Sequence, residues 1–263
     1  MKQAINAVIF DWAGTTIDYG CFAPLLPFVE AFKEFGLTPT LAEVRAPMGM
    51  LKIDHIRELL TLDRIKQQFI TQYQRQPNFE DIQNIYSIFE QHVFKHLTQF
   101  TQPIDGVVET VAQLREMNLI IGSTTGYTSQ MMEIVVPATA EKGYKPDLWV
   151  AADQVKRGRP YPYMIYQNML ELDIPNIRGI VKIGDTISDI LEGLAAGCIS
   201  VGVIEGSSEL GLSKAEFDSI DFATQRTAKL KIRNRMYAAG ANYVIDNIQE
   251  LPSLICALNS CYN

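Results

Sequence analysis

Acidic, hydroxyl and basic residues follow short apolar runs at four places in the chain. They are Asp11 after AVIF, Ser123, Thr124 and Thr125 after LIIG, Arg159 in GRPYP, and Asp185 and Asp189 in GDTISD. A carboxylate can attack phosphorus, hydroxyl groups and a guanidinium can bind phosphoryl oxygens, and further carboxylates can hold Mg²⁺. Each motif alone is also typical of a helix cap or a turn, but together they predict phosphoryl transfer.

The apolar runs that precede these residues are typical of buried parallel strands. We expect strands at 7–10, 119–123, 147–152, 179–184, 199–203 and 243–245. Segments with apolar residues at helical spacing, such as GVVETVAQLREMN and SDILEGLAAG, separate the strands. This order predicts an α/β fold with a doubly wound, parallel-sheet, Rossmann-like core. Ligands bind such sheets at the carboxyl ends of the strands, where all four motifs would meet.

The stretch between the first two strands breaks the alternation. Residues 20 to 100 contain no strand-like run, and segments such as FAPLLPFVEAFKEFG and GMLKIDHIRELLTL indicate about four helices. We therefore predict an inserted α-helical cap domain at 21–99 and a catalytic core made of 1–20 and 100–263. Gly20 and the segment 103–106 are the expected hinge connections, because both ends of an insertion pass through one neck.

Position 13 departs from the pattern that phosphatases with an Asp nucleophile share, which is Asp-x-Asp with the second carboxylate as general acid. The chain has Ala13 there, in DWAGTTIDYGCFAP. This segment, together with APMGMLKIDHIR, GSTTGYT, GRPYP, GDTISDILEGLAAG and GSSELGLS, resembles the haloacid dehalogenase superfamily and, more closely, its phosphonatase family. The resemblance extends over almost the whole chain.

The resemblance implies hydrolysis of the carbon–phosphorus bond of phosphonoacetaldehyde to acetaldehyde and phosphate, with Mg²⁺ as cofactor. It implies a nucleophile and metal ligand at Asp11, a metal-binding backbone carbonyl at Ala13, a metal carboxylate at Asp185, and a Schiff base at Lys52 with His55 as its proton partner. It further places Met48, Gly49, Cys21 and Tyr127 near the substrate, and it implies a homodimer joined through the cap. Asp189 belongs to the metal site either as a direct ligand or as a residue that orients one.

The residues themselves explain why an amine would replace the acid. Carbon does not leave phosphorus as a free carbanion, so the breaking bond needs an electron sink, which an imine between an amine and the aldehyde provides. Lys52 follows the apolar segment APMGML, and His55 lies on the same helical face. A fall in the pKa of this lysine from about 10.4 to about 7.5 requires roughly 4 kcal/mol of environmental bias, which burial can supply.

Two local questions and two rival functions stay open at this level. Arg157 competes with Arg159 for the phosphate, although Arg159 directly precedes the Pro-x-Pro element and is preferred. The sequence also does not select among Ser123, Thr124 and Thr125 as the phosphate-binding hydroxyl. The rivals are a phosphomonoesterase or sugar-phosphate mutase of the same superfamily, and a catalytically silent binding protein on the same fold.

Composition excludes several classes of partner. The 263 residues carry a formal net charge of −7, so no broad basic field is present for a nucleic-acid backbone. No run approaches the roughly 18 apolar residues needed to cross a membrane. The four cysteines form no Cys-x-x-Cys pair, which favours reduced thiols and a cytoplasmic location. We expect a small phosphonate as the substrate, with neither nucleic acid nor membrane as a partner.

Overall fold

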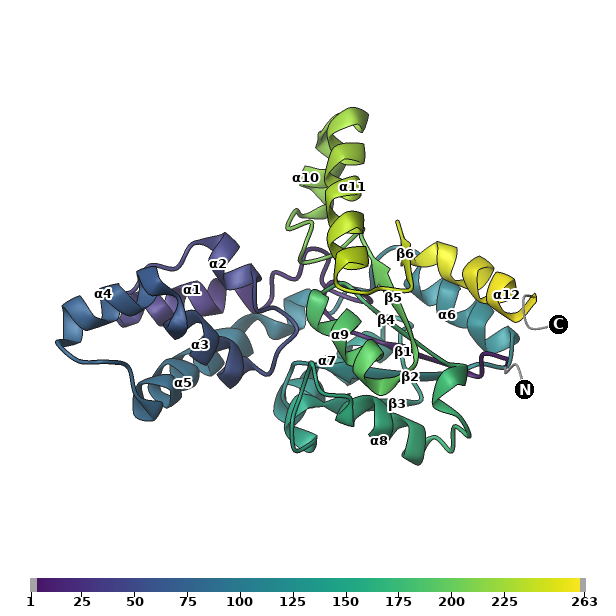
Figure 1. Ribbon diagram of the computed structural model, residues 1–263, viewed down its shortest axis with the longest axis horizontal. Helices are drawn as coiled ribbons and strands as arrows, with labels where there is room; N and C mark the ends of the chain where they lie inside the picture. The colour runs from purple at the N-terminus through teal and green to yellow at the C-terminus, as the bar shows by residue number, and fades with distance from the viewer. Residues whose placement is uncertain (1–3, 261–263) are drawn as a thin grey trace.

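The structure is a computed structural model that describes residues 4–260, and its centre is a parallel β-sheet. The sheet has six strands in the order β3-β2-β1-β4-β5-β6 (Figure 1). The strands are β1 (Ala7–Phe10), β2 (Ile120–Thr125), β3 (Leu148–Ala151), β4 (Ile180–Gly184), β5 (Ile199–Val203) and β6 (Tyr243–Ile245). The predicted α/β class with a parallel, doubly wound core is therefore confirmed, and each strand coincides with its apolar run to within a few residues.

Helices cover both faces of the sheet because successive side chains of a strand point to opposite sides. Val8 and Phe10 of β1 join the apolar core beneath one set of helices, whereas Ala7 and Ile9 pack under the other set. The first set is α6 (Val107–Glu116), α7 (Ser129–Ala140) and α12 (Leu251–Ser260). The second set includes α8 (Tyr163–Glu171) and α9 (Ile187–Ala196). Burial of the sheet on both faces explains why its strands are continuous apolar runs.

A group of helices is inserted between β1 and β2 and lies beside the sheet, at the left of Figure 1. It consists of α1 (Leu25–Glu34), α2 (Leu41–Arg45), α3 (Lys52–Thr61), α4 (Asp63–Tyr73) and α5 (Phe79–His96). The sequence indicated about four helices here. The additional one is α2, a helix of only five residues that Thr40 caps. Phe28 of α1 stacks on Phe89 of α5 at a ring-centroid distance of 4.2 Å, and both side chains belong to the same apolar core as Val8 and Phe10 of β1.

The two connections between the insert and the sheet run side by side. Ile17 pairs with Pro103 in an antiparallel bridge, and the amide of Ile104 donates to the carbonyl of Thr16 at 2.9 Å. Gly20 follows this bridge with φ +86°, a conformation that an L side chain rarely adopts. The neck therefore consists of two short segments of the chain that are hydrogen-bonded to each other.

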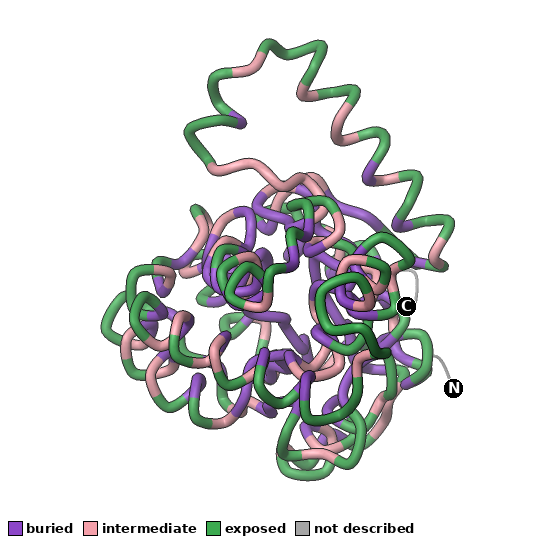
Figure 2. Tube along the Cα trace, turned by 90° about the vertical axis from the view of Figure 1, so that its left-hand side faces the viewer, coloured by how far each residue is buried: buried purple, intermediate pink, exposed green. Residues whose placement is uncertain are grey.

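A second projection rises from the core near β5 and β6. It contains α10 (Lys214–Ser219) and α11 (Phe222–Ala238), and most of its residues are exposed (Figures 1 and 2). The strand-helix pattern of the sequence did not indicate α11, because its apolar residues do not gather on one face. Only Ile232 and Met236 of α11 are buried.

Two further expectations concern thiols and membranes. Cys21 and Cys198 are buried free thiols and Cys256 is an exposed one, whereas Cys261 lies outside the described residues. Within residues 4–260, no helix combines the length and the apolar character needed to cross a membrane.

Candidate active site

The register of the sheet brings the polar ends of three strands together. Phe10 of β1 is paired with Ser123 of β2 on one side and with Ile183 of β4 on the other. The next residues along these strands are Asp11 after β1, Thr124 and Thr125 at the end of β2, and Asp185 after β4. Parallel strands end at the same edge of a sheet, so the sequence motifs converge at this edge as predicted.

Three buried carboxylates form a cluster that fits a divalent cation. Asp11, Asp185 and Asp189 each present an oxygen within 4.8 Å of the others. Burial and mutual repulsion raise the pKa values of Asp11 and Asp185. Among residues 4–260, no ion pair includes Asp185, whose oxygens accept from the Thr15 hydroxyl at 3.2 Å and the Ser208 amide at 2.7 Å. A buried carboxylate without a cationic side chain, beside two more carboxylates, is a suitable site for a hard cation such as Mg²⁺.

Asp189 differs from the other two carboxylates because side chains already occupy both of its oxygens. Oδ1 lies 2.7 Å from Lys182 Nζ and 3.1 Å from Arg159 Nη2, and Oδ2 accepts from the Thr186 hydroxyl at 2.5 Å. Burial alone would raise the pKa of Asp189, but Arg159 and Lys182 outweigh that effect and hold the pKa below its ordinary value. Asp189 is therefore ionised and firmly oriented.

Arg159 is buried at the centre of the site. Its Nη1 lies 2.7 Å from Asp11 Oδ1, and its Nε donates to Glu192 at 2.9 Å. Arg157, by contrast, is exposed and lies over the ring of Tyr161, 4.8 Å from the centroid. Only Arg159 of these two arginines faces the carboxylate cluster.

The three hydroxyl residues at the end of β2 have different surroundings. Ser123 Oγ accepts from the indole of Trp12 at 2.9 Å and donates to the carbonyl of Leu148 at 3.1 Å. Thr124 Oγ1 is held between Arg159 and Glu192. Thr125, which accepts from the Tyr127 amide at 3.1 Å, lies on the wall of the cavity that contains Asp11.

The loop after β1 brings the backbone of residues 13 and 14 close to the carboxylate cluster. Gly14 has φ +90°, and a Cβ at this position would lie 2.4 Å from Asp185 Oδ2. Only glycine therefore allows this turn beside the carboxylate. Ala13 lines the same cavity as Asp11 and contributes a methyl group where an acid would otherwise stand.

Lys52 begins α3 and is buried, with 3% of its surface exposed. Its Nζ lies 5.1 Å from the ring centroid of Tyr127 and 5.9 Å from that of Phe28. Burial lowers the pKa of this amine, although the Asp11 carboxylate partly opposes the effect. The structure thus provides a poorly solvated amine in the cavity that Asp11 lines.

His55 lies behind Lys52 and is also buried. Its Nε2 is 2.9 Å from the carbonyl oxygen of Val44, which can only accept, so Nε2 carries the proton of the neutral ring. Its Nδ1 has no hydrogen-bond partner among the described residues. Burial and the neighbouring Lys52 hold the pKa of His55 well below its ordinary value, so Nδ1 is a free lone pair in a dry environment.

Cys21 and Tyr127 complete the walls of the cavity around the Lys52 amine. Burial raises the pKa values of the Cys21 thiol and the Tyr127 hydroxyl, so both groups keep their protons at neutral pH. The Tyr127 hydroxyl has no partner among the described residues. Both groups are uncharged at neutral pH, which suits a neutral aldehyde.

The loop before α3 lies directly on the core. A Cβ on Gly126 would lie 2.6 Å from the carbonyl oxygen of Met50 and 2.8 Å from that of Gly49. Gly49 itself has φ +85°, and a Cβ there would lie 2.6 Å from Thr186 Oγ1. The adjoining Met48 is buried. Such close backbone approach means that the insert is closed over the strand ends.

One small cavity gathers most of the predicted residues. Its walls are Asp11, Ala13, Cys21, Gly49, Lys52, Thr125, Gly126, Tyr127, Arg159 and Thr186. Met48, His55, Ser123 and Thr124 are buried close by but do not line it. The sequence reasoning missed Gly126, Thr186, Lys182 and Glu192. A lysine inside the otherwise apolar run IVKIG was the signal for Lys182, and the helical spacing from Asp189 was the signal for Glu192.

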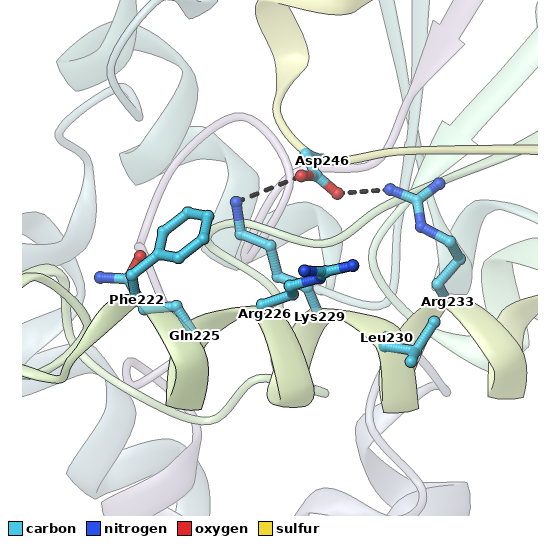
Figure 3. A pocket seen from close by; sticks show the side chains of 7 residues that line it. All are labelled: Phe222, Gln225, Arg226, Lys229, Leu230, Arg233 and Asp246. Atoms are coloured by element: carbon cyan, nitrogen blue, oxygen red, sulfur yellow. Dashed lines mark hydrogen bonds and ion pairs between the residues drawn. The ribbon is translucent and has the colours of Figure 1, made fainter.

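A separate groove runs along α11 and beside Asp246, which follows β6 (Figure 3). Figure 3 shows that Asp246 lies between two of its cations, Lys229 at 3.3 Å and Arg233. The groove contains none of the residues predicted to do chemistry. We therefore assign the candidate active site to the cavity around Asp11.

Comparisons with known proteins show the family of this chain. A model of the haloacid dehalogenase-like hydrolases matches residues 5–197. Phosphonoacetaldehyde hydrolase of Parabacteroides distasonis is 49% identical over 261 residues, which cover 99% of this chain and 98% of that protein. The enzyme of the same name from Bacillus cytotoxicus is 48% identical over 251 residues, or 95% of each chain. The crystal structure of a phosphonoacetaldehyde hydrolase-like protein from Oleispira antarctica has a TM-score of 0.96 at 36% identity, covering 99% of this chain and 95% of that one. This chain belongs to the phosphonoacetaldehyde hydrolase family of the haloacid dehalogenase superfamily.

Proposed function

We propose that this protein hydrolyses the carbon–phosphorus bond of phosphonoacetaldehyde to acetaldehyde and phosphate. The observation that carries the proposal is the cavity in which the buried amine of Lys52 and the carboxylate of Asp11 line the same walls. Relatives that bear the name of this activity and are 48% and 49% identical support the choice of substrate. The chemistry is a carboxylate attack on phosphorus combined with an imine that accepts electrons.

Lys52 begins the reaction. Its neutral amine adds to the aldehyde and releases water, which leaves a protonated imine on Nζ. Asp11 then attacks phosphorus, the carbon–phosphorus bond breaks, and its electrons enter an enamine on Lys52. Protonation of the enamine carbon and attack of water on the resulting imine release acetaldehyde, and a second water hydrolyses the aspartyl phosphate. One water is consumed overall.

Ala13 fits this route because the leaving carbon needs no acid beside it. An ester phosphatase protonates the leaving oxygen, and the methyl group of Ala13 cannot do so. This difference disfavours the rival phosphomonoesterase and mutase functions. The complete set of amine, nucleophile and guanidinium in one cavity disfavours a silent binding protein.

Binding of the phosphonate is assigned to Arg159 and Thr125. Arg159 Nη1 already faces the nucleophile, 2.7 Å from Asp11 Oδ1, and Thr125 is the hydroxyl residue of its strand that lines the cavity. The side chains of Ser123 and Thr124 are engaged elsewhere, so they support the site from beneath.

Asp11 and Asp185, with the backbone carbonyl of Ala13, would hold Mg²⁺, and Asp189 would orient the surrounding groups. When bound, the ion supplies positive charge to the phosphoryl oxygens and to the attacking carboxylate. The buried Asp185, which has no cationic partner within residues 4–260, supports this assignment.

Proton transfers around the imine are assigned to the groups behind Lys52. Nδ1 of His55 is unpartnered and can accept a proton, whereas Cys21 and Tyr127 retain theirs and can donate hydrogen bonds. Met48 and Gly49 belong to the loop that shields Lys52 from water. This shielding would limit premature hydrolysis of the imine.

We further propose that 21–99 acts as a cap domain on a core formed by 1–20 and 100–263, and that two chains associate through the cap. Leu26 on α1 is 55% exposed, which is compatible with an apolar contact between copies. Sedimentation of wild type and Leu26→Glu would test the association, because a charge at such a contact would favour monomers.

The decisive experiment measures phosphate and acetaldehyde release from phosphonoacetaldehyde with Mg²⁺, and borohydride trapping on Lys52. Borohydride should inactivate the enzyme only when an aldehyde is present, and the reduced adduct should map to the peptide MLKIDHIR. Lys52→Arg should lose trapping and turnover, because a guanidinium does not condense with the aldehyde. The exposed Lys33→Arg serves as the matched control and should behave as wild type. An adduct on another lysine would overturn the mechanism.

A further inference from the structure

Glu192 of α9 is a buried carboxylate directly behind Arg159. Its Oε2 accepts from Arg159 Nε at 2.9 Å and from Thr124 Oγ1 at 3.1 Å. We infer that Glu192 is a positioning residue that fixes the guanidinium of Arg159 so that Nη1 faces the phosphoryl group. The inference rests on the proposed function, because it assigns Arg159 to phosphonate binding.

The hydrogen bonds of Arg159 are distributed unevenly around the guanidinium. Nε donates to Glu192, and Nη2 donates to the carbonyl and hydroxyl of Thr124 at 2.8 and 2.7 Å. Nη1 makes no aligned hydrogen bond with the described residues, although it lies 2.7 Å from Asp11 Oδ1. The donors that point away from the cavity are thus occupied, and Nη1, which pairs with the nucleophile Asp11, is the donor on the side of the ligand.

Lys182 of β4 offsets part of the free-energy cost of burying the Glu192 carboxylate. Its Nζ lies 2.7 Å from Asp189 Oδ1 and 3.6 Å from Glu192 Oε2, and its side chain is fully buried. A buried carboxylate is costly unless a cation and hydrogen bonds compensate it. Lys182 and Arg159 therefore share Asp189 and Glu192 in one network, in which each cation lies against both carboxylates.

Removal of Glu192 would free the guanidinium to rotate. The nearest remaining carboxylates of Arg159 are Asp11 and Asp189, and a guanidinium favours two parallel hydrogen bonds to a carboxylate. Such a bidentate pair with Asp11 would occupy the nucleophile and withdraw Nη1 from the ligand. Lys52 is not in contact with Glu192, so imine formation would be spared.

The experiment compares Glu192→Gln and Glu192→Leu with wild type. Gln keeps an oxygen that can accept from Arg159 Nε, whereas Leu has none. Calorimetric Kd for inorganic phosphate with Mg²⁺ should rise about 3- to 10-fold in Glu192→Gln and about 30- to 100-fold in Glu192→Leu. The KM for phosphonoacetaldehyde should rise in the same order, while trapping of acetaldehyde on Lys52 by borohydride stays within about twofold of wild type. Ile190→Val, a buried change on the same helix away from Arg159, should leave all three quantities unchanged.

Three outcomes separate this inference from a structural role and from the proposed function. Wild-type phosphate affinity in Glu192→Gln and Glu192→Leu would overturn the inference. A parallel loss of trapping and phosphate affinity in the near-isosteric Glu192→Gln would also overturn it, because the whole site would then have been disturbed. Failure of wild type to cleave phosphonoacetaldehyde would refute the proposed function, but the phosphate Kd values would still decide the role of Glu192.

Discussion

Gly126→Ala tests whether the close seating of the insert on the core is needed for catalysis. The new Cβ would lie 2.6 and 2.8 Å from two backbone carbonyl oxygens of the insert, where an ordinary contact begins at 3.4 Å. The loop that precedes Lys52 must therefore retreat by about 0.6 to 0.8 Å, because backbone atoms cannot rotate away as a flexible side chain can. The alanine itself is not strained, since Gly126 is absent from the residues with positive φ.

This retreat would separate the imine from the nucleophile. A misplacement of about 1 Å costs roughly 100-fold in rate, so a shift of this size should lower kcat/KM for phosphonoacetaldehyde about 30- to 100-fold. The corresponding loss of transition-state stabilisation is about 2 to 3 kcal/mol. Steady-state phosphate release measures the effect, and thermal unfolding checks that the core is intact.

Gly202→Ala is the matched control for this prediction. Its Cβ would lie 2.4 Å from Met236 Sδ, an equally short approach, but to a flexible side chain on α11 that can rotate away. It should keep kcat/KM within about twofold of wild type. If Gly126→Ala also kept its activity, the closed position of the insert would not be what aligns Lys52 with Asp11.

Three further perturbations address the nucleophile, the missing acid and the neck. Asp11→Asn should abolish phosphate release, because an amide cannot form the acyl phosphate, yet it should leave borohydride trapping on Lys52 intact. Full activity of this variant would refute the assignment of the nucleophile. EDTA should abolish the activity of wild type until Mg²⁺ is added back. Ala13→Asp should not speed phosphonate cleavage, because a carboxylate beside Asp11 repels the phosphoryl group, and a several-fold gain in kcat would show that leaving-group protonation limits the rate. Burial raises the pKa of Asp18 from 3.8 to about 7, so between these pH values the folded chain keeps a proton that the unfolded chain has lost. The free energy of unfolding should therefore fall with rising pH, by at most about 1.4 kcal/mol per pH unit. Urea titrations at pH 5 and 7 should show a smaller fall in Asp18→Asn than in wild type. An equal fall in the two proteins would contradict a buried, protonated carboxyl group at Asp18.

Local patterns were sufficient to predict the elements and the type of chemistry. The strand at Ala7–Phe10 follows from four consecutive apolar residues, and it places Asp11 at a strand end wherever the other strands lie. Helical spacing within a few residues of Lys52 predicted α3, and an insert made of helices follows from the same periodicity. The absence of a general acid next to the nucleophile follows directly from the identity of Ala13 in the sequence. These features depend on neighbours along the chain, which the sequence displays directly.

The tertiary structure decided which of these side chains face the cavity and what holds them. Ser123 and Thr125 lie in the same strand, yet Ser123 is hydrogen-bonded to Trp12, 111 positions away, and Thr125 reaches the cavity. Glu192 and Lys182 matter because packing of α9 on β4 brings them behind Arg159. Burial likewise lowers the pKa of Lys52, whose preceding loop closes on Gly126. Each of these effects is a contact or a loss of solvent between segments far apart in the chain, and no local periodicity encodes it.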